Sequence, residues 1–130
     1  QAIWALGLAD SAYVRYGDFV NRKKRYVALP KVREFIQEQP PECRMEYQAI
    51  VDRLEIDGFL VEPYGKKLEP ELFEIRVRTG RQIRVFYCYH EDDIVFGVHA
   101  FVKKTQRTPV RELRQARRVI GRIKRGDYNG

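Results

Sequence analysis

The segment from residue 72 to residue 109 constrains the fold of this 130-residue chain more than any other part. Apolar and polar side chains alternate there over three consecutive stretches, residues 73–78, 82–89 and 94–103. Such alternation predicts β-strands with one buried face and one open face. The short connections at residues 79–81 and 90–93 predict that antiparallel hairpins join the three strands.

The lengths of these connections also predict how the strands pair. Arg76 should lie opposite Arg84, and Arg84 opposite His99, which places the apolar sets of all three strands on one face. Like charges directly opposite each other destabilise a sheet by up to about 1 kcal/mol, so a row of arginines and a histidine predicts a bound anion. The same open face is expected to carry Lys103, Phe86 and Phe101.

Helices are expected on both sides of this segment in the sequence. Proline at positions 30 and 41 and apolar residues at helical spacing predict a helical hairpin over residues 30–40 and 41–57, with Gly58 as a C-terminal cap. A final helix is expected from Pro109 to Arg125, with a strongly basic outer face. Residues 22–29 predict an edge strand, and residues 59–70 are expected to form a loop.

The composition indicates one basic α+β domain. The formal charge of +7 and the pI of about 9.6 favour a polyanionic partner such as nucleic acid. The two cysteines lack metal-ligand spacing and indicate reduced thiols in a cytoplasmic protein, and no apolar run predicts a membrane span. We expect an appended N-terminal arm over residues 1–22, the domain over residues 23–125 and a frayed tail over residues 126–130.

Four motifs together give the chain a family resemblance. The order GKKL, ELFEIR, RQIRVFY and VHAFVKKTQRTP, followed by a helix, resembles the RelE-like toxins of bacterial toxin–antitoxin systems, in particular their HigB-like, phage-derived branch. The resemblance covers roughly residues 23–125. It implies a small twisted antiparallel sheet with an N-terminal helical hairpin and a C-terminal helix, the helices packing on one face. It also implies a ribosome-dependent endoribonuclease that needs no metal or other cofactor and is inhibited by a cognate antitoxin, expected to be a helix-turn-helix DNA-binding protein.

The resemblance and the charge pattern together select the candidate site residues. Arg84 matches the arginine that grips the scissile phosphate in this family, and Lys103 or Lys104 matches the basic residue after the next strand. Glu74 stands where some members carry a lysine, and either acid–base chemistry or pairing with an arginine is open to it. The candidate catalytic residues are Arg76, Arg84, His99, Lys103 and Lys104. The candidate RNA-binding residues are Lys66, Lys67, Arg78, Phe86, Phe101 and Arg107.

These residue types suit metal-free RNA cleavage. The reaction must remove a proton from the 2′-hydroxyl, stabilise charge on the phosphate and protonate the 5′-oxygen. Arginine forks bind phosphate oxygens, a lysine among arginines becomes a stronger acid, and histidine exchanges protons near neutral pH. Phenylalanine on an open sheet face can stack on a base, although it more often packs under a helix or a partner.

Three other functions fit the same sequence. The first is an RNA-binding module without catalysis, which is distinguished by whether Arg76, Arg84 and Lys103 converge. The second is a ParE-like inhibitor of DNA gyrase on the same fold, a branch that generally lacks the basic row. The third is an inactive remnant of a toxin.

Overall fold

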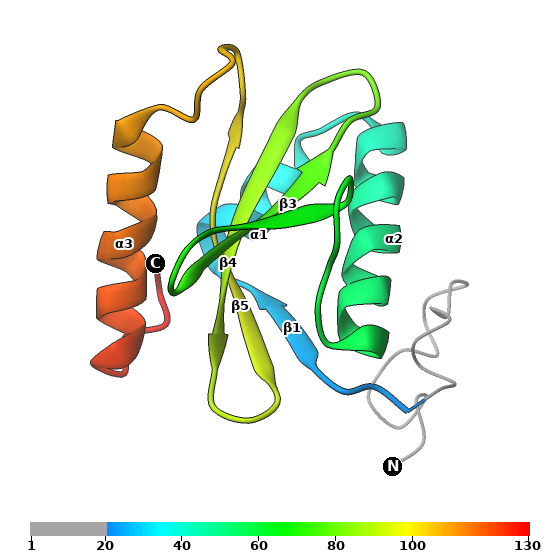
Figure 1. Cartoon of the computed structure of the whole chain (residues 1–130). Coiled ribbons are helices and arrows are strands. Elements are labelled where there is room, and N and C mark those ends of the chain that lie inside the picture. The colour runs from blue at the N-terminus through cyan, green and yellow to red at the C-terminus, as the bar shows by residue number, and fades with distance from the viewer. Residues whose placement is uncertain (1–20) are drawn as a thin grey trace.

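The computed structural model describes residues 21–130, which form a five-stranded sheet between two helical layers (Figure 1). The expected arm lies almost entirely outside the described residues. Along the chain the elements are β1 (Arg25–Ala28), α1 (Pro30–Gln37), α2 (Pro41–Asp57), β2 (Gly65–Glu69), β3 (Leu72–Val77), β4 (Ile83–His90), β5 (Ile94–Val102) and α3 (Val110–Lys124). The predicted α+β class is therefore confirmed.

The strand order is β1-β5-β4-β3-β2, and β1 runs parallel to its neighbour β5. The expectation of a purely antiparallel sheet is wrong at this edge, because β1 runs in the same direction as β5, whereas β4, on the other side of β5, runs in the opposite direction. Glu55 of α2 holds this edge strand in place. Its carboxylate accepts a hydrogen bond of 2.8 Å from the backbone N–H of Tyr26, and its side chain is buried.

The helical hairpin forms as predicted. Pro30 and Pro41 occupy the first positions of α1 and α2, where a missing N–H costs nothing. Gly58 closes α2 with a φ of 87°, a left-handed conformation that a side chain would strain. The turn chemistry near the helix ends was therefore a reliable guide.

The expected loop over residues 59–70 contains a strand. Residues Gly65–Glu69 form β2, which pairs antiparallel with β3 and makes the second edge of the sheet. The segment GKKLE contains two adjacent lysines, both exposed in the structure, and only one large apolar residue. It therefore lacks the apolar alternation by which a strand is predicted. Its backbone pairs with β3 all the same.

The register confirms one predicted pair and corrects the other. Arg76 lies opposite Arg84, but Arg84 lies opposite Phe101, and His99 lies opposite Phe86. Two local features cause this difference of two residues. His90 is part of β4 and pairs with Ile94, which shortens the turn, and a bulge between Phe86 and Tyr87 adds a further shift.

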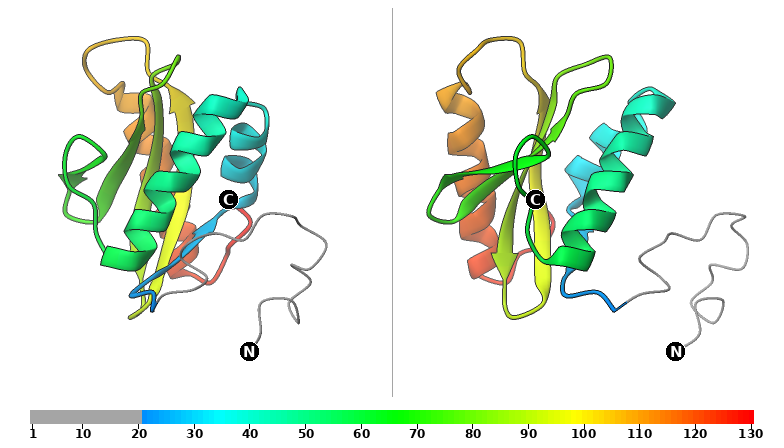
Figure 2. Two further views of the ribbon diagram at one scale, coloured as in Figure 1. Left: turned by 90° about the vertical axis from the view of Figure 1, so that its right-hand side faces the viewer. Right: turned by 45° about the vertical axis from the view of Figure 1, so that its right-hand side comes forward.

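Each face of the sheet carries its own apolar core. On one side α1 and α2 pack over Ile75, Val85 and Tyr87, and on the other side α3 packs over Phe86 and Val98. Figure 2 shows the sheet between these two layers. The expectations that the helices cover one face and leave the other open are therefore wrong.

The bulge explains why the apolar residues of β5 do not share one face. Ala100 and Val102 pack on the α1–α2 side as expected, whereas Phe96 and Val98, beyond the bulge, pack on the α3 side. An extra residue in one strand reverses the alternation from that point on.

The end of the chain folds back onto the α3 side of the sheet. The ring of Tyr128 stacks on Phe96 with centroids 5.4 Å apart, and Gly130 is buried against Val119. Part of the segment expected to fray, Tyr128 and Gly130, thus contacts the α3-side core. Across residues 21–130, no helix is both long and apolar enough to cross a membrane.

Candidate functional site

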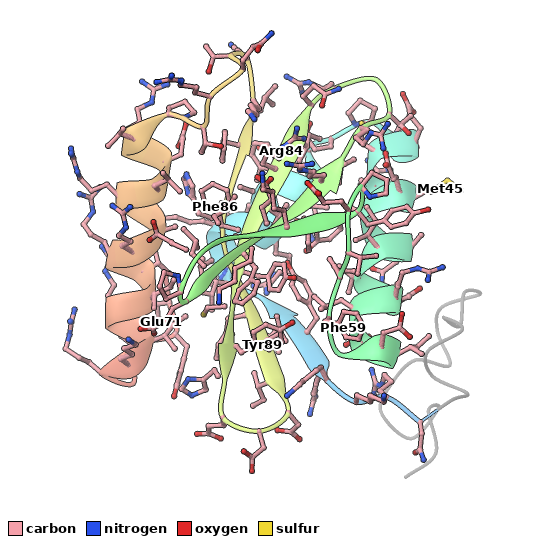
Figure 3. The ribbon with its side chains drawn as sticks, in the orientation of Figure 1. Met45, Phe59, Glu71, Arg84, Phe86 and Tyr89 are labelled. Carbon is pink, nitrogen blue, oxygen red and sulfur yellow. The ribbon has the colours of Figure 1, made fainter. Side chains whose placement is uncertain are left out.

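Three basic residues meet on the α3 side of the sheet, beside the first residues of β4. Arg76 of β3 lies directly opposite Arg84 of β4. Lys103 follows β5 and donates its backbone N–H to the carbonyl oxygen of Gln82 at 2.6 Å, which places it beside the same strand end. We call Arg76, Arg84 and Lys103 the basic cluster. Figure 3 shows Arg84 in this position, with Phe86 further along the same strand.

Glu74 provides a negative charge inside the basic cluster. Its Oε2 accepts a hydrogen bond of 2.8 Å from Arg76 Nε, and its Oε1 lies 3.7 Å from Arg84 Nε. The carboxylate is only 1% exposed, and among residues 21–130 neither Oε1 nor Arg84 Nε has a hydrogen-bond partner. The anion that the facing arginines require is therefore supplied in part by the protein itself. Of the two roles left open for Glu74, the structure shows pairing with arginine.

Arg84 is the least accessible member of the cluster. It is 8% exposed, and its guanidinium donates to the carbonyl oxygen of Ile83 at 3.2 Å and to Gln82 Oε1 at 3.4 Å. Burial lowers the pKa of Arg84, the Glu74 carboxylate opposes this effect, and the positive charges of Arg76 and Arg78 add to it. An arginine remains charged under such conditions, so the group is a fixed positive charge of restricted orientation.

Lys103 has an environment that makes it a stronger acid. Partial burial lowers its pKa, and the positive charge of Arg84 is the next largest cause. Glu74 opposes the shift, while Arg76 and Lys66 add to it. Lysine loses its proton more readily wherever positive neighbours disfavour the charged form. The positive charge of Lys66 of β2, which lies opposite Glu74, therefore also influences the electrostatics of this site.

His99 lies one pair further along β5 and contacts the first turn of α3. Its Nε2 is 2.7 Å from Glu112 Oε1, and its ring stacks on Phe101 with centroids 5.7 Å apart. A carboxylate that binds one ring nitrogen fixes the orientation of the imidazole. Our sequence reasoning missed Glu112. An acidic residue in the first turn of a helix that follows a candidate strand was the available signal.

The two phenylalanines do not form a stacking platform. Phe86 is fully buried and Phe101 is 7% exposed, and the two rings meet edge to face at 5.2 Å beneath α3. A base cannot reach either ring in this arrangement. The predicted stacking role is corrected to packing in the α3-side core.

The other candidate residues lie apart from the basic cluster. Lys67 points to the opposite face of the sheet, where its Nζ lies 5.8 Å from the centre of the Phe73 ring. Arg78 is exposed beside the β3–β4 hairpin. Lys104 and Arg107 are exposed in the segment that joins β5 to α3. They extend the basic surface but do not share the contacts of Arg84.

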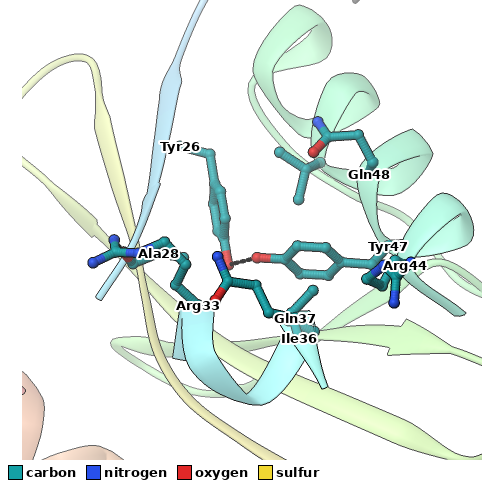
Figure 4. Close-up of a pocket in the computed structure, with 9 residues that line it drawn as sticks. Tyr26, Ala28, Arg33, Ile36, Gln37, Arg44, Tyr47 and Gln48 are labelled. Carbon is teal, nitrogen blue, oxygen red and sulfur yellow. Dashed lines mark hydrogen bonds between the residues drawn. The ribbon is translucent and has the colours of Figure 1, made fainter. Parts of the chain in front are cut away.

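A separate pocket lies on the other side of the sheet (Figure 4). It has a volume of about 340 Å³ and lies between β1, α1 and α2. Tyr47 donates a hydrogen bond of 2.6 Å to the hydroxyl oxygen of Tyr26 at its floor. Arg33 and Arg44 also line it. This pocket shares no lining residue with the basic cluster.

The fold and the basic cluster define a small basic α+β protein with a charged site at one end of a sheet face. The chain belongs to the family described as phage-derived protein Gp49-like (DUF891), whose model matches residues 34–120. This is a family of RelE- and HigB-like toxins of toxin–antitoxin systems, so a cognate antitoxin is implied as a partner. A search of curated proteins finds no match.

Proposed function

We propose that this protein is the toxin of a type II toxin–antitoxin system and cleaves messenger RNA on the ribosome without a metal ion. The observation that carries the proposal is the meeting of Arg76, Arg84 and Lys103 around Glu74. Net positive charge at one point of the sheet suits a phosphodiester better than a neutral ligand.

In the proposed reaction the arginines hold the scissile phosphate. Arg76 is the more accessible of the two, with a side chain 23% exposed, and the side chain of Arg84 is 9% exposed. Glu74 keeps both side chains in place and is too deeply buried to take a proton from a ribose. Removing one such donor typically costs about 3 kcal/mol in the barrier, which is roughly a hundredfold in rate.

The proton transfers are assigned to Lys103 and His99. His99, oriented by Glu112, accepts the proton of the 2′-hydroxyl as its oxygen attacks phosphorus. Lys103 protonates the departing 5′-oxygen, a task that its lowered pKa favours. The products are a 2′,3′-cyclic phosphate and a free 5′-hydroxyl, and no atom from a metal-bound water is required.

The decisive experiment is to map new RNA ends by primer extension in a cell-free translation reaction. Wild type should give cuts that are phased with codons, and these cuts should disappear when ribosomes are omitted from the reaction. Arg84→Ala and Lys103→Ala should each reduce cleavage about a hundredfold. Arg81→Ala, an exposed arginine of the neighbouring hairpin, should cleave like wild type.

Because Arg84 is buried, the folded state of each variant is checked by circular dichroism. Lys103 has no ion pair in the described part of the chain, so Lys103→Ala tests the chemistry without breaking one. An intact message with normal translation would reject the cleavage proposal. It would leave RNA binding without cleavage, or inhibition of DNA gyrase as in ParE-like proteins, as the function to test next.

The antitoxin is expected to be a helix-turn-helix DNA-binding protein with an acidic segment. Purified complex should dissociate more readily as salt rises if that segment covers the basic cluster.

A further inference from the structure

The outward face of α3 carries a row of arginines that the proposed cleavage does not use. Arg114, Arg118 and Arg125 are exposed and Arg122 is partly exposed, and these four residues are called the α3 arginine row. They lie opposite the buried stripe of the helix, which includes Ala116, Val119 and Ile123. Figure 3 shows nitrogen-tipped side chains projecting from α3 away from the sheet.

The α3 arginine row differs in its ion pairing from the neighbouring basic residues Arg117 and Lys124, which we call the flank of the row. On the flank, Arg117 pairs with Glu69 at 2.7 Å and Lys124 pairs with Glu71 at 2.6 Å. Within residues 21–130, no member of the α3 arginine row pairs with a carboxylate. Arg118 instead donates to the amide oxygen of Gln115 at 2.6 Å.

This arrangement weakens the helix by itself. Arg114 and Arg118, and Arg118 and Arg122, are like charges four residues apart, and such pairs are unfavourable. Gly121 is a further weakness, because glycine within a helix is less favourable than alanine. A methyl group at position 121 would meet only the flexible end of Arg125, at 3.6 Å, so packing within the described residues does not require glycine.

Gly121 and the arginines around it form a shallow hollow. Its volume is about 530 Å³, and it is lined by Arg114, Arg117, Arg118, Gly121, Arg122 and Arg125. A hollow bordered almost entirely by guanidinium groups is suited to phosphate, since their planar forks bind two oxygens at once.

We propose that the α3 arginine row is a second binding surface, which holds structured RNA by its phosphate backbone. The outward positions from 111 to 125 carry arginine, glutamine or glycine, without an aromatic or large aliphatic anchor. Protein interfaces usually have such anchors, whereas nucleic-acid interfaces are more polar and more positive. The row spans about 17 Å along the helix, enough to follow several phosphates. Ribosomal RNA is the source of structured RNA that the proposed function would place nearby.

The test uses an RNA duplex of about 20 base pairs and arbitrary sequence, with binding measured between 50 and 200 mM KCl. The triple variant Arg114→Gln, Arg118→Gln, Arg122→Gln should bind at least tenfold more weakly. Its plot of log affinity against log salt should lose about three units of slope, since each phosphate contact contributes roughly one. The matched control is Lys31→Gln with Arg53→Gln, which removes exposed charge from α1 and α2, on the other side of the sheet, and should change each quantity much less.

Three results would overturn the proposal. One is an equal loss per charge in the control, which would mean that net charge alone attracts RNA. Another is unchanged duplex binding in the triple variant. The third is preferential binding of polyglutamate at the same ionic strength, which would assign the row to an acidic protein. Gly121→Glu, which places a carboxylate in the hollow without disturbing the core face, should weaken duplex binding as well.

The outcome can be separated from that of the cleavage proposal. Duplex binding is measured without ribosomes and without a translated message, so it reports on the row and does not depend on cleavage. RNA binding by the row would then stand even if no message is cut.

Discussion

Glu74 and Arg84 lie diagonally across neighbouring strands with Oε1 and Nε 3.7 Å apart, and within residues 21–130 neither atom has a hydrogen-bond partner. Both side chains are buried, so this is a charge pair in an environment of low dielectric. Glu74 and Arg84 attract each other electrostatically, but in the described part of the chain Glu74 Oε1 and Arg84 Nε each still have an unused hydrogen-bonding site. A water molecule or a phosphate oxygen could bind there.

Replacing Glu74 by glutamine should lower the stability of the protein and increase its response to phosphate. The change keeps the shape but leaves the buried charge of Arg84 uncompensated, so the free energy of unfolding should fall by about 3 kcal/mol. Inorganic phosphate should stabilise this variant more than wild type, because a bound anion replaces the missing charge. Urea unfolding at 1 and 50 mM phosphate measures both effects.

Glu62→Gln is the matched control for that measurement. Glu62 also contacts Arg76, at 3.4 Å, but its side chain is 63% exposed, so the loss should be below about 1 kcal/mol. Equal effects of the two substitutions would show that the burial of Glu74 does not determine the strength of its pairing.

Lys103 should titrate below the ordinary lysine value of 10.5, because burial and the charge of Arg84 disfavour its protonated form. Arg84→Gln should raise the pKa of Lys103 by removing that charge, and Arg81→Gln should not. The ¹³Cε shift of Lys103 followed against pH measures this directly. A Lys103 curve that is the same in wild type and in Arg84→Gln would contradict the coupling.

The lowered pKa of Lys103 also predicts a dependence of stability on pH. Between the folded-state pKa and 10.5 the unfolded chain binds more protons than the folded chain does. Stability therefore rises with pH across that window from this residue alone. Lys103→Met should remove this part of the slope in urea midpoints measured from pH 8 to pH 10.5.

The sequence predicted those parts of the fold that depend on local patterns. The ends of α2 followed from Pro41 and Gly58, and the pairing of Arg76 with Arg84 followed from a short turn. The pairing of Arg84 with Phe101 did not follow, because it depends on a bulge that alternation alone does not mark. Strand β2 was missed for a related reason, since an edge strand with exposed lysines has no apolar face to detect.

The candidate site was predicted in its charges but not in its surroundings. Arg76, Arg84 and Lys103 lie together as expected. The internal anion Glu74 and the partner Glu112 of His99 required the tertiary structure, since each acts across strands or across elements. Phe86 was assigned to RNA because the sequence did not show that α3 covers that face.

Cys88 should be unreactive in the folded protein. Burial raises the pKa of its thiol to about 11, with the nearby charge of Glu71 as a further cause, so little thiolate forms at pH 8. In a Cys43→Ala background, Ellman's reagent should label Cys88 only at the rate of unfolding, and at once in guanidinium. Rapid labelling of the native protein would indicate that the α3-side core opens locally at that strand.

Gly97 should be required because of one side chain on the neighbouring strand. A methyl group at this position would overlap the hydroxyl of Tyr26 and lie 2.9 Å from its Cζ. That hydroxyl is fixed by its hydrogen bond from Tyr47, so the ring cannot move away at low cost. Gly97→Ala should therefore lower the free energy of unfolding by about 2–3 kcal/mol, a typical cost of overpacking.

A double-mutant cycle identifies the cause of that loss. Tyr26→Phe removes the overlapping oxygen and costs about 1 kcal/mol through the lost hydrogen bond. The double variant should be less destabilised than the two single effects added together, because the overlap and the hydrogen bond involve the same atom. Strict additivity in urea unfolding would instead place the strain of Gly97→Ala in the backbone of β5, independent of Tyr26.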